Sequence, residues 1–413
     1  MKLKLISLIL ALALCVSCFS ACGKTAAMPT VTGTTPESSD PTETVTQTDI
    51  SEGDAEAEAD AESEADAEAE AEARYQKYLH AYGKHDPDAV VMNVNGQDIR
   101  WRDFFSWLYD IMAQMEDSLE ITDWSAPFTE MEDYLNDPTY GSYAFSFAAQ
   151  NASQIAVLFT KAAEQGITLT DAQSENLDAT MQSYYDSYGG EDAFLALIQQ
   201  HFLTEDYFRQ QTKAMMLYQN LFENAYGKNA ERFPADEAVA YARSCGYMYA
   251  KHILFSTVDD DSNPLPEETI AEKKALAEQV LAELQGYPVE ELEANFDRLA
   301  QEYSEDPGLM YSPDGYYFLP GEMVEPFETA TKALDELEMS GIVESDFGYH
   351  IIFCPVLQAD AIVGYNSDYE PFTPRDMGAA EEFNTTVQSW FTDALIIPSD
   401  EFASPDLNEL LAP

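Results

Sequence analysis

Cysteine and basic residues are both scarce in this sequence. Apart from Cys15, Cys18 and Cys22 near the start, the chain contains only Cys245 and Cys354, which excludes a small scaffold held by several disulfides and a zinc site built from cysteines. Lysine and arginine number 20 against 76 aspartates and glutamates, for a net charge of −56. A protein that binds nucleic acid needs a basic face to neutralise phosphates, so we exclude nucleic acid as a partner.

The apolar run at the start of the chain is too short to span a bilayer. It covers residues 5–16, follows Lys2 and Lys4, and leads into small residues at 20–21, which is typical of a secretory signal peptide over residues 1–21. Residues 19–22, FSAC, resemble a bacterial lipobox, which implies cleavage before Cys22 and a lipid on its sulfur. Two acyl chains would hold the protein on the extracytoplasmic face of the cell membrane. The alternative is an ordinary cleaved signal peptide that includes Cys22.

The segment after the cysteine contains little that could form a core. Residues 24–50 are rich in threonine, proline and serine, and residues 52–72 alternate alanine with glutamate or aspartate. Such a sequence buries too little apolar surface to offset its loss of conformational entropy. We therefore predict a lipid-anchored, disordered acidic linker over residues 22–74, and an alanine-glutamate helix for the acidic run is the alternative.

The remaining chain has enough apolar residues for more than one domain. An alternating segment at 90–99 with an Asn-Gly pair predicts a strand and a tight turn, and the next residues carry apolar side chains at helical spacing from Trp101 to Met115. Thr170 and Thr204 are candidate N-caps. Further helices are predicted at 143–165, 170–187, 191–201, 204–226 and 235–244.

Four short motifs follow in order within about a hundred residues. They read AKHIL at 250–254, YSEDPG at 303–308, GEMVEPF at 321–327 and FGYHII at 347–352. Together they resemble the parvulin family of peptidyl-prolyl cis/trans isomerases, and the rest of the chain resembles lipoprotein foldases of the PrsA/SurA type.

The predicted fold class is α+β, with a mostly helical chaperone module and an inserted parvulin-like domain. Within that domain we expect strands at 247–256 and 350–355 and helices at 267–285, 289–303 and 326–334, arranged as an antiparallel sheet wrapped by helices. The predicted division is 75–245 for the chaperone module, 246–357 for the isomerase domain and 358–413 for a helical tail. The resemblance implies that this tail returns to the chaperone module. The strand register places Cys245 several residues from the position opposite Cys354, which disfavours a disulfide.

The resemblance also implies the site residues. His252 and His350 match the paired histidines of the family, Asp306 stands at a position that is cysteine or aspartate, and Ser345 matches a hydroxyl position. These four residues are expected to form one polar network beneath the substrate amide. Structural support of the fold is the alternative role for the two histidines, and capping of the turn at 307–308 is the alternative role for Asp306.

The resemblance places the proline pocket at Met323 and Phe327. Where the family commonly has GGDLG, this chain reads SPDGYYF at 312–318, so the leucine that helps to wall the pocket is absent. Tyr316 or Tyr317 would replace it, and we expect Tyr316 and Phe318 to contact substrate as well. A non-catalytic domain that only captures proline-containing segments is the alternative that this departure leaves open.

Isomerisation of an X–Pro bond requires rotation about an amide with a barrier of about 18–20 kcal/mol, and needs neither nucleophile, metal nor cofactor. The loop at 258–264 carries Asp259, Asp260 and Asp261, which would repel a phosphorylated substrate. The sequence therefore predicts an extracytoplasmic foldase that acts on unfolded secreted proteins with X–Pro bonds and is held on the membrane through Cys22. It leaves the oligomeric state open. The alternative is a non-catalytic chaperone or binding lipoprotein.

Overall fold

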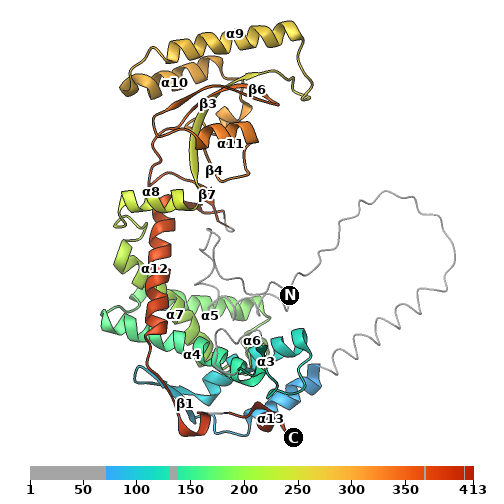
Figure 1. The fold of residues 1–413 in the computed structure, drawn as a ribbon. Coiled ribbons are helices and arrows are strands. Elements are labelled where there is room, and N and C mark those ends of the chain that lie inside the picture. Colours follow the sequence, from blue (N-terminus) through green and yellow to red (C-terminus); the bar gives the residue numbers. More distant parts are fainter. Residues whose placement is uncertain (1–70, 130–137, 367–368, 404) are drawn as a thin grey trace, which may run out of the picture. The chain divides into compact units, whose positions relative to one another are not determined.

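The computed structural model of the chain describes residues 71–129, 138–366, 369–403 and 405–413. The predicted signal peptide, Cys22 and the linker up to residue 70 lie outside the described residues. The described chain divides into two compact units (Figure 1). The first contains the described residues up to Phe222 together with Thr386–Pro413, and the second is Glu223–Thr385.

The sheet of the first unit joins the two ends of the described chain. It contains β1 (Val90–Val94), β2 (Gln97–Arg100) and β9 (Ile396–Pro398) in the antiparallel order β2-β1-β9. Asn95 and Gly96 connect β1 to β2 with positive φ angles of 51° and 89°, as the Asn-Gly pair predicts for a two-residue hairpin turn. The last part of the chain therefore completes a sheet that begins at Val90.

Helices make up the rest of the first unit. After residues 71–82, which are helical, the helices are α3 (Trp101–Leu119), α4 (Tyr140–Glu164), α5 (Asp171–Ser187), α6 (Glu191–Gln199), α7 (Glu205–Tyr226), η3 (Asp400–Phe402) and α13 (Leu407–Leu411). The helix predicted from residue 143 begins three residues earlier because Thr139 and Ser142 form a capping box. Thr170 caps α5 as predicted.

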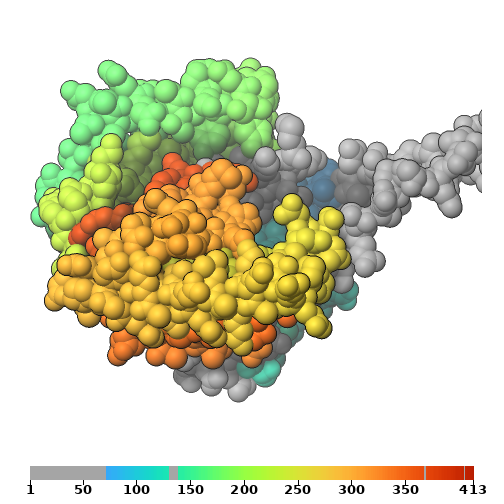
Figure 2. All heavy atoms as spheres, turned by 90° about the horizontal axis from the view of Figure 1, so that it is seen from above, coloured from blue at the N-terminus to red at the C-terminus, as the bar shows by residue number. Residues whose placement is uncertain are grey.

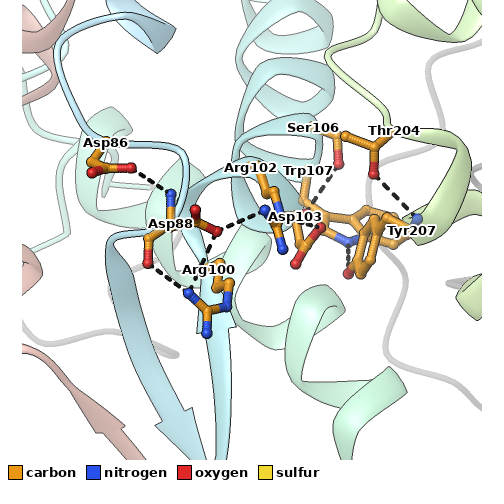
Figure 3. Close-up of polar contacts among 9 residues, drawn as sticks. All are labelled: Asp86, Asp88, Arg100, Arg102, Asp103, Ser106, Trp107, Thr204 and Tyr207. Atoms are coloured by element: carbon orange, nitrogen blue, oxygen red, sulfur yellow. Dashed lines mark hydrogen bonds and ion pairs between the residues drawn. The ribbon is translucent and has the colours of Figure 1, made fainter.

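Polar contacts tie α3 to its neighbours in the first unit (Figure 3). The indole of Trp107 donates to the hydroxyl of Tyr207 on α7 at 2.9 Å, and Thr204 accepts from the backbone N–H of Tyr207 at 3.2 Å, as expected for an N-cap. Arg102 lies 2.7 Å from Asp88. These bonds satisfy polar groups around an otherwise apolar helix face.

An aromatic cluster holds the C-terminal segment against the first unit. Phe402 is buried and stacks on Trp101 with ring centroids 5.3 Å apart. His85 packs on Phe402 at 4.7 Å, and Lys84 Nζ donates to the backbone carbonyl of Glu409 at 2.8 Å. This segment therefore contributes core residues as well as a strand.

The second unit is built on a four-stranded antiparallel sheet with the order β4-β3-β6-β5. Its strands are β3 (Met248–Ser256), β4 (Tyr316–Phe318), β5 (Met339–Ser345) and β6 (Gly348–Phe353). β3 and β6 lie in the centre, and alternate residues along them face opposite sides of the sheet. Gly348 has a φ of 143° and lies so close to β3 that a Cβ atom would meet the carbonyl of Phe255 at 2.2 Å.

Helices cover both faces of this sheet. α9 (Glu267–Leu284) and α10 (Val289–Tyr303) pack on one face, where Ile253, Phe255, Ile351 and Phe353 are fully buried. Figure 2 shows these two helices as a yellow-to-gold outer layer. α11 (Glu325–Lys332) packs on the other face. The α+β fold class is thus confirmed, and the strand alternation determines which residues share the α11 face.

Shorter elements complete the second unit. They are α8 (Ala235–Ser244), η2 (Pro307–Met310), β7 (Gly364–Tyr365), β8 (Pro371–Phe372) and most of α12 (Pro374–Thr392). Cys245 and Cys354 are free thiols, as the register indicated, because Phe353 pairs with Lys251 rather than with a residue beside Cys245. Within the described ranges, no helix is both long and apolar enough to cross a membrane.

Candidate isomerase site

The two predicted histidines lie side by side on the α11 face of the sheet. His252 on β3 pairs with Ile352 on β6, and His350 on β6 pairs with Leu254 on β3, so all four side chains point to the same face. The two imidazole rings stack with centroids 5.3 Å apart, and their Nδ1 atoms are 3.1 Å apart. Since this distance allows a hydrogen bond, one ring donates and the other accepts.

Asp306 lies beside the histidine pair at the start of η2. Its Oδ2 is 2.8 Å from Nε2 of His252 and accepts from the hydroxyl of Tyr316 at 2.5 Å. Its Oδ1 accepts from the backbone N–H of Gly308 at 3.0 Å, which caps the turn that follows. The same carboxylate therefore has both arrangements considered from the sequence, a polar contact in the site and a cap on the turn.

Ser345, at the end of β5, completes the network. Its Oγ is 2.7 Å from Nε2 of His350 and accepts from the backbone N–H of Phe347 at 3.1 Å. Ser345 pairs with Gly348 where β5 meets β6, so the hairpin itself sets the position of the hydroxyl. The structure thus brings together His252, Asp306, Ser345 and His350, the four residues expected to form one polar network.

The protonation states follow from burial and hydrogen bonding. Burial raises the pKa of Asp306, but hydrogen bonds from His252 and Tyr316 outweigh it and lower the pKa to about 2, so the carboxylate is charged. Burial, reinforced by the charge of His252, lowers the pKa of His350 to about 4, so this imidazole is neutral at pH 7.

Hydrogen bonds join the four side chains into one network. Because an ionised carboxylate only accepts, His252 carries its proton on Nε2 and donates to Asp306. His350 then joins His252 to Ser345 through its two ring nitrogens, Nδ1 towards His252 and Nε2 towards the Ser345 hydroxyl. The network therefore runs from Ser345 through the two imidazoles to the negative charge of Asp306.

An apolar cluster lies against the histidine pair. Phe327 on α11 contacts both rings edge-on, with centroids 5.2 Å from His252 and 5.6 Å from His350. Phe327 and Phe318 are buried, whereas Met323 is half-buried and packs against this cluster. These three of the four predicted substrate contacts thus share one apolar surface beside the polar network, with Met323 at its accessible edge. Their role in substrate binding stays a prediction.

Tyr316 and Tyr317 point to opposite sides of β4. Tyr317 stacks on Tyr249 with centroids 4.2 Å apart and packs in a separate cluster. Tyr316 faces the site, with its ring 5.6 Å from His252, and is therefore the candidate for the wall that the missing leucine would provide. Its hydrogen bond to Asp306 raises the pKa of the hydroxyl further than burial alone does. The sequence did not predict this bond.

A cavity of about 180 Å³ adjoins His252 and Tyr316 on the side of α10. Lys251 lines it, but its Nζ lies 2.8 Å from Asp297 and 3.0 Å from Glu293, so its charge is already balanced. Among the residues that the structure describes, no group of three or more metal-ligating side chains could hold a metal ion.

Residues 239–355 match the protein family described as the PPIC-type PPIase domain. This segment of the chain is therefore similar to PPIase domains of the parvulin type. The match contains all four sequence motifs and confirms the resemblance that they indicated. It begins within α8, a few residues before the domain boundary predicted at 246, and that boundary stays a prediction.

The chain is also similar to curated proteins and to solved structures. The chain is 27% identical over 198 residues to the Foldase protein PrsA of Staphylococcus aureus strain MRSA252, covering 47% of this chain and 54% of that protein. It thus spans about half the length of the curated relatives it matches. Among solved structures, PrsA of Bacillus subtilis is 19% identical with a TM-score of 0.20, covering 79% of this chain and 98% of that one. PrsA of Bacillus cereus is 18% identical with a TM-score of 0.24, covering 79% of this chain and 99% of that one.

Proposed function

We propose that this chain is an extracytoplasmic foldase that catalyses cis/trans isomerisation of X–Pro bonds in unfolded secreted proteins. The observation that carries the proposal is a fixed negative charge on Asp306, joined to His252 and His350, beside an apolar surface on α11. The match of this segment to PPIase domains supports it.

The proposed mechanism is electrostatic. In a planar amide the carbonyl oxygen carries partial negative charge, and this charge decreases as the C–N bond twists and resonance is lost. A negative charge held near the carbonyl oxygen disfavours the planar state more than the twisted one, so it lowers the barrier. Asp306 supplies this charge, and the imidazoles of His252 and His350 hold it in place. No covalent bond to the enzyme forms.

The apolar surface holds the ring while the preceding residue rotates. Met323 at the accessible edge and Phe327 beneath it would contact the proline ring, with Tyr316 on the other side. Burying a ring of this size contributes about 1–3 kcal/mol of binding free energy. This anchoring is useful for catalysis because rotation requires that one side of the bond stay fixed.

The first residues of the chain support a location outside the cell membrane, and the foldase relatives support unfolded secreted proteins as clients. Residues 19–22 resemble a lipobox, so we propose a lipid anchor at Cys22 that holds the protein on the outer face of the cell membrane. The predicted acidic linker would let the two units reach chains that emerge there. Because Asp259, Asp260 and Asp261 give the loop at 258–264 negative charge, we propose that the clients are unphosphorylated.

One observation supports a non-catalytic binding domain as a second candidate. The Tyr316 hydroxyl occupies a lone pair of Asp306, and this bond disperses the negative charge that the mechanism uses. A domain in this state would still bind proline-containing segments through α11. The intact hydrogen-bond network from Ser345 through the two histidines to Asp306 favours the catalytic function.

Exchange NMR on a short X–Pro peptide, with a protein that comprises residues 71–413, tests the proposal. The expected result is accelerated exchange between cis and trans signals that Asp306→Ala abolishes. Peptide binding without any acceleration would assign the domain to the non-catalytic class.

A further inference from the structure

Two large apolar side chains stand exposed directly after Asp306. Met310 is 78% exposed and Tyr311 is 83% exposed, and they follow Asp306 by four and five residues. Single exposed apolar residues are common on protein surfaces. Two adjacent ones at this level of exposure, beside the candidate site of a highly acidic chain, suggest a binding role.

The segment that leads to these residues is bonded to the central strand β3. The backbone N–H of Glu305 donates to the carbonyl of Leu254 at 2.8 Å, and the backbone N–H of Leu254 donates to Ser304 Oγ at 3.1 Å. The backbone N–H of Ser256 donates to the side chain of Glu305 at 2.9 Å. The position of the following turn is thus fixed relative to His252, which lies on the same strand.

The turn itself is closed by hydrogen bonds around Gly308. Asp306 caps it, and the backbone N–H groups of Tyr311 and Ser312 both donate to the carbonyl of Gly308 at 2.9 Å. A Cβ atom at position 308 would lie 2.3 Å from the hydroxyl of Tyr316, so the turn packs directly on a residue of the site. Met310 and Tyr311 are therefore carried by a turn whose position is fixed relative to Asp306 and Tyr316.

The three adjacent apolar residues Leu309, Met310 and Tyr311 differ in burial. Leu309 is half-buried and lines the cavity beside His252 and Tyr316, so it anchors the turn. Met310 and Tyr311 do not share this burial. Met310 and Tyr311 are almost fully exposed, so neither contributes buried apolar area to the fold.

We propose that Met310 and Tyr311 form an apolar rim that binds large apolar client residues next to the X–Pro pair. The inference rests on the proposed function and adds a substrate preference to it. In an extended client, successive residues advance by about 3.3–3.6 Å, so residues flanking the X–Pro pair pass over the turn while the proline ring contacts α11. Methionine adapts to varied apolar partners, and tyrosine offers a broad face with little conformational freedom to lose. Because the turn is pre-ordered, binding requires little further loss of entropy.

Two peptides and two protein variants test this rim. Both peptides keep Ala-Pro at the centre, and the residues on either side of this pair are phenylalanine in one peptide and alanine in the other. Met310→Ser combined with Tyr311→Ser removes the rim. Tyr369→Ser is the matched control, because Tyr369 is 87% exposed in the same unit but lies outside the site residues. The measured quantity is the ratio of kcat/KM for the two peptides by exchange NMR.

We expect the wild type and Tyr369→Ser to prefer the phenylalanine-flanked peptide, and the double variant to lose about fivefold to tenfold of that preference while retaining its rate on the alanine-flanked peptide. An unchanged ratio, or an equal loss on both peptides, would overturn the rim. A wild type that accelerates neither peptide would instead overturn the proposed isomerase activity, and the rim with it.

Discussion

At the scale of single residues, Asp306 is the side chain on which most of the site depends. One carboxylate oxygen faces His252 and Tyr316, and the other caps the turn through Gly308. A substitution there changes charge and local structure together, unless the replacement keeps one function and removes the other.

Asn and Ala substitutions of Asp306 separate these functions. Asp306→Asn keeps an oxygen for the Gly308 N–H but removes the negative charge that His252 and Tyr316 face, so we predict a loss of isomerase rate of about tenfold or more with the turn still capped. Asp306→Ala loses the cap as well, which costs about 1 kcal/mol. Melting temperature and exchange NMR on both variants check this. Full activity in folded Asp306→Asn would contradict the electrostatic role.

His350 makes the stability of the second unit depend on pH. Its pKa is 6.5 in an unfolded chain and about 4 in the folded site, so below pH 6.5 the unfolded state binds a proton that the folded state does not. The stabilisation is complete above about pH 6.5 and is lost as the pH falls to about 4, by up to about 3 kcal/mol.

Urea denaturation at several pH values measures this effect. Loss of stability from Asp306 should come later, between pH 3.8 and about 2, because its pKa is lowered from 3.8 to about 2. His350→Gln should reduce the dependence of the free energy of unfolding on pH between pH 6.5 and 4. It should leave unchanged the loss of stability between pH 3.8 and about 2. An identical slope in wild type and His350→Gln would show that His350 is not the group responsible.

At the scale of elements, α11 and the residues just before it provide both a core residue, Phe327 on the helix, and an accessible one, Met323 ahead of its N-cap Val324. Phe327 is 3% exposed, so Phe327→Ala would leave a cavity and cost about 3–5 kcal/mol of stability, which confounds its effect on activity. Met323 is half-buried, so we predict that Met323→Ala lowers kcat/KM about tenfold with nearly unchanged melting temperature. An unaltered rate in this variant would remove Met323 from the pocket.

The sequence predicted the elements with strong local signals. The helices α9 and α10 have clear apolar periodicity, and the motifs around His252 and His350 located the central strands. β4 and β5 were not predicted, because β4 has only three residues and β5 shows no regular alternation of burial. β9 was missed since its side chains are exposed, and only pairing with β1 makes it a strand.

The same reasoning explains what was predicted of the site. The motifs gave His252, Asp306, Ser345 and His350, whose contacts follow from their positions on paired strands. The bond between Tyr316 and Asp306 depends on how β4 pairs with β3 and how close the turn at Gly308 approaches. Such long-range register is not encoded in local patterns, so the sequence left Tyr316 and Tyr317 as alternatives.

At the scale of the whole molecule, the C-terminal segment belongs to the first unit. Removing residues 396–413 deletes β9 and Phe402, and leaves the edge of β1 unpaired. We predict that this truncation destabilises the first unit by more than about 3 kcal/mol and leaves isomerase activity unchanged. Limited proteolysis combined with the peptide assay measures both. Leu395→Ala, at an exposed position, serves as a control, and a truncated protein with a native proteolysis pattern would contradict the prediction.

The pairing of β1 with β9 also sets an order of events during synthesis. Asn95 and Leu395 are hydrogen-bonded although they lie 300 residues apart, whereas the second unit is a continuous stretch, Glu223–Thr385. At about 5–20 residues per second, β1 waits on the order of 15–60 s for its last partner strand. Residues 239–355, which match the PPIase domain, end 41 residues before β9 begins, which corresponds to roughly 2–8 s at this rate. This segment can therefore fold before β9 closes the first unit, and during that time the new copy is itself an incompletely folded chain.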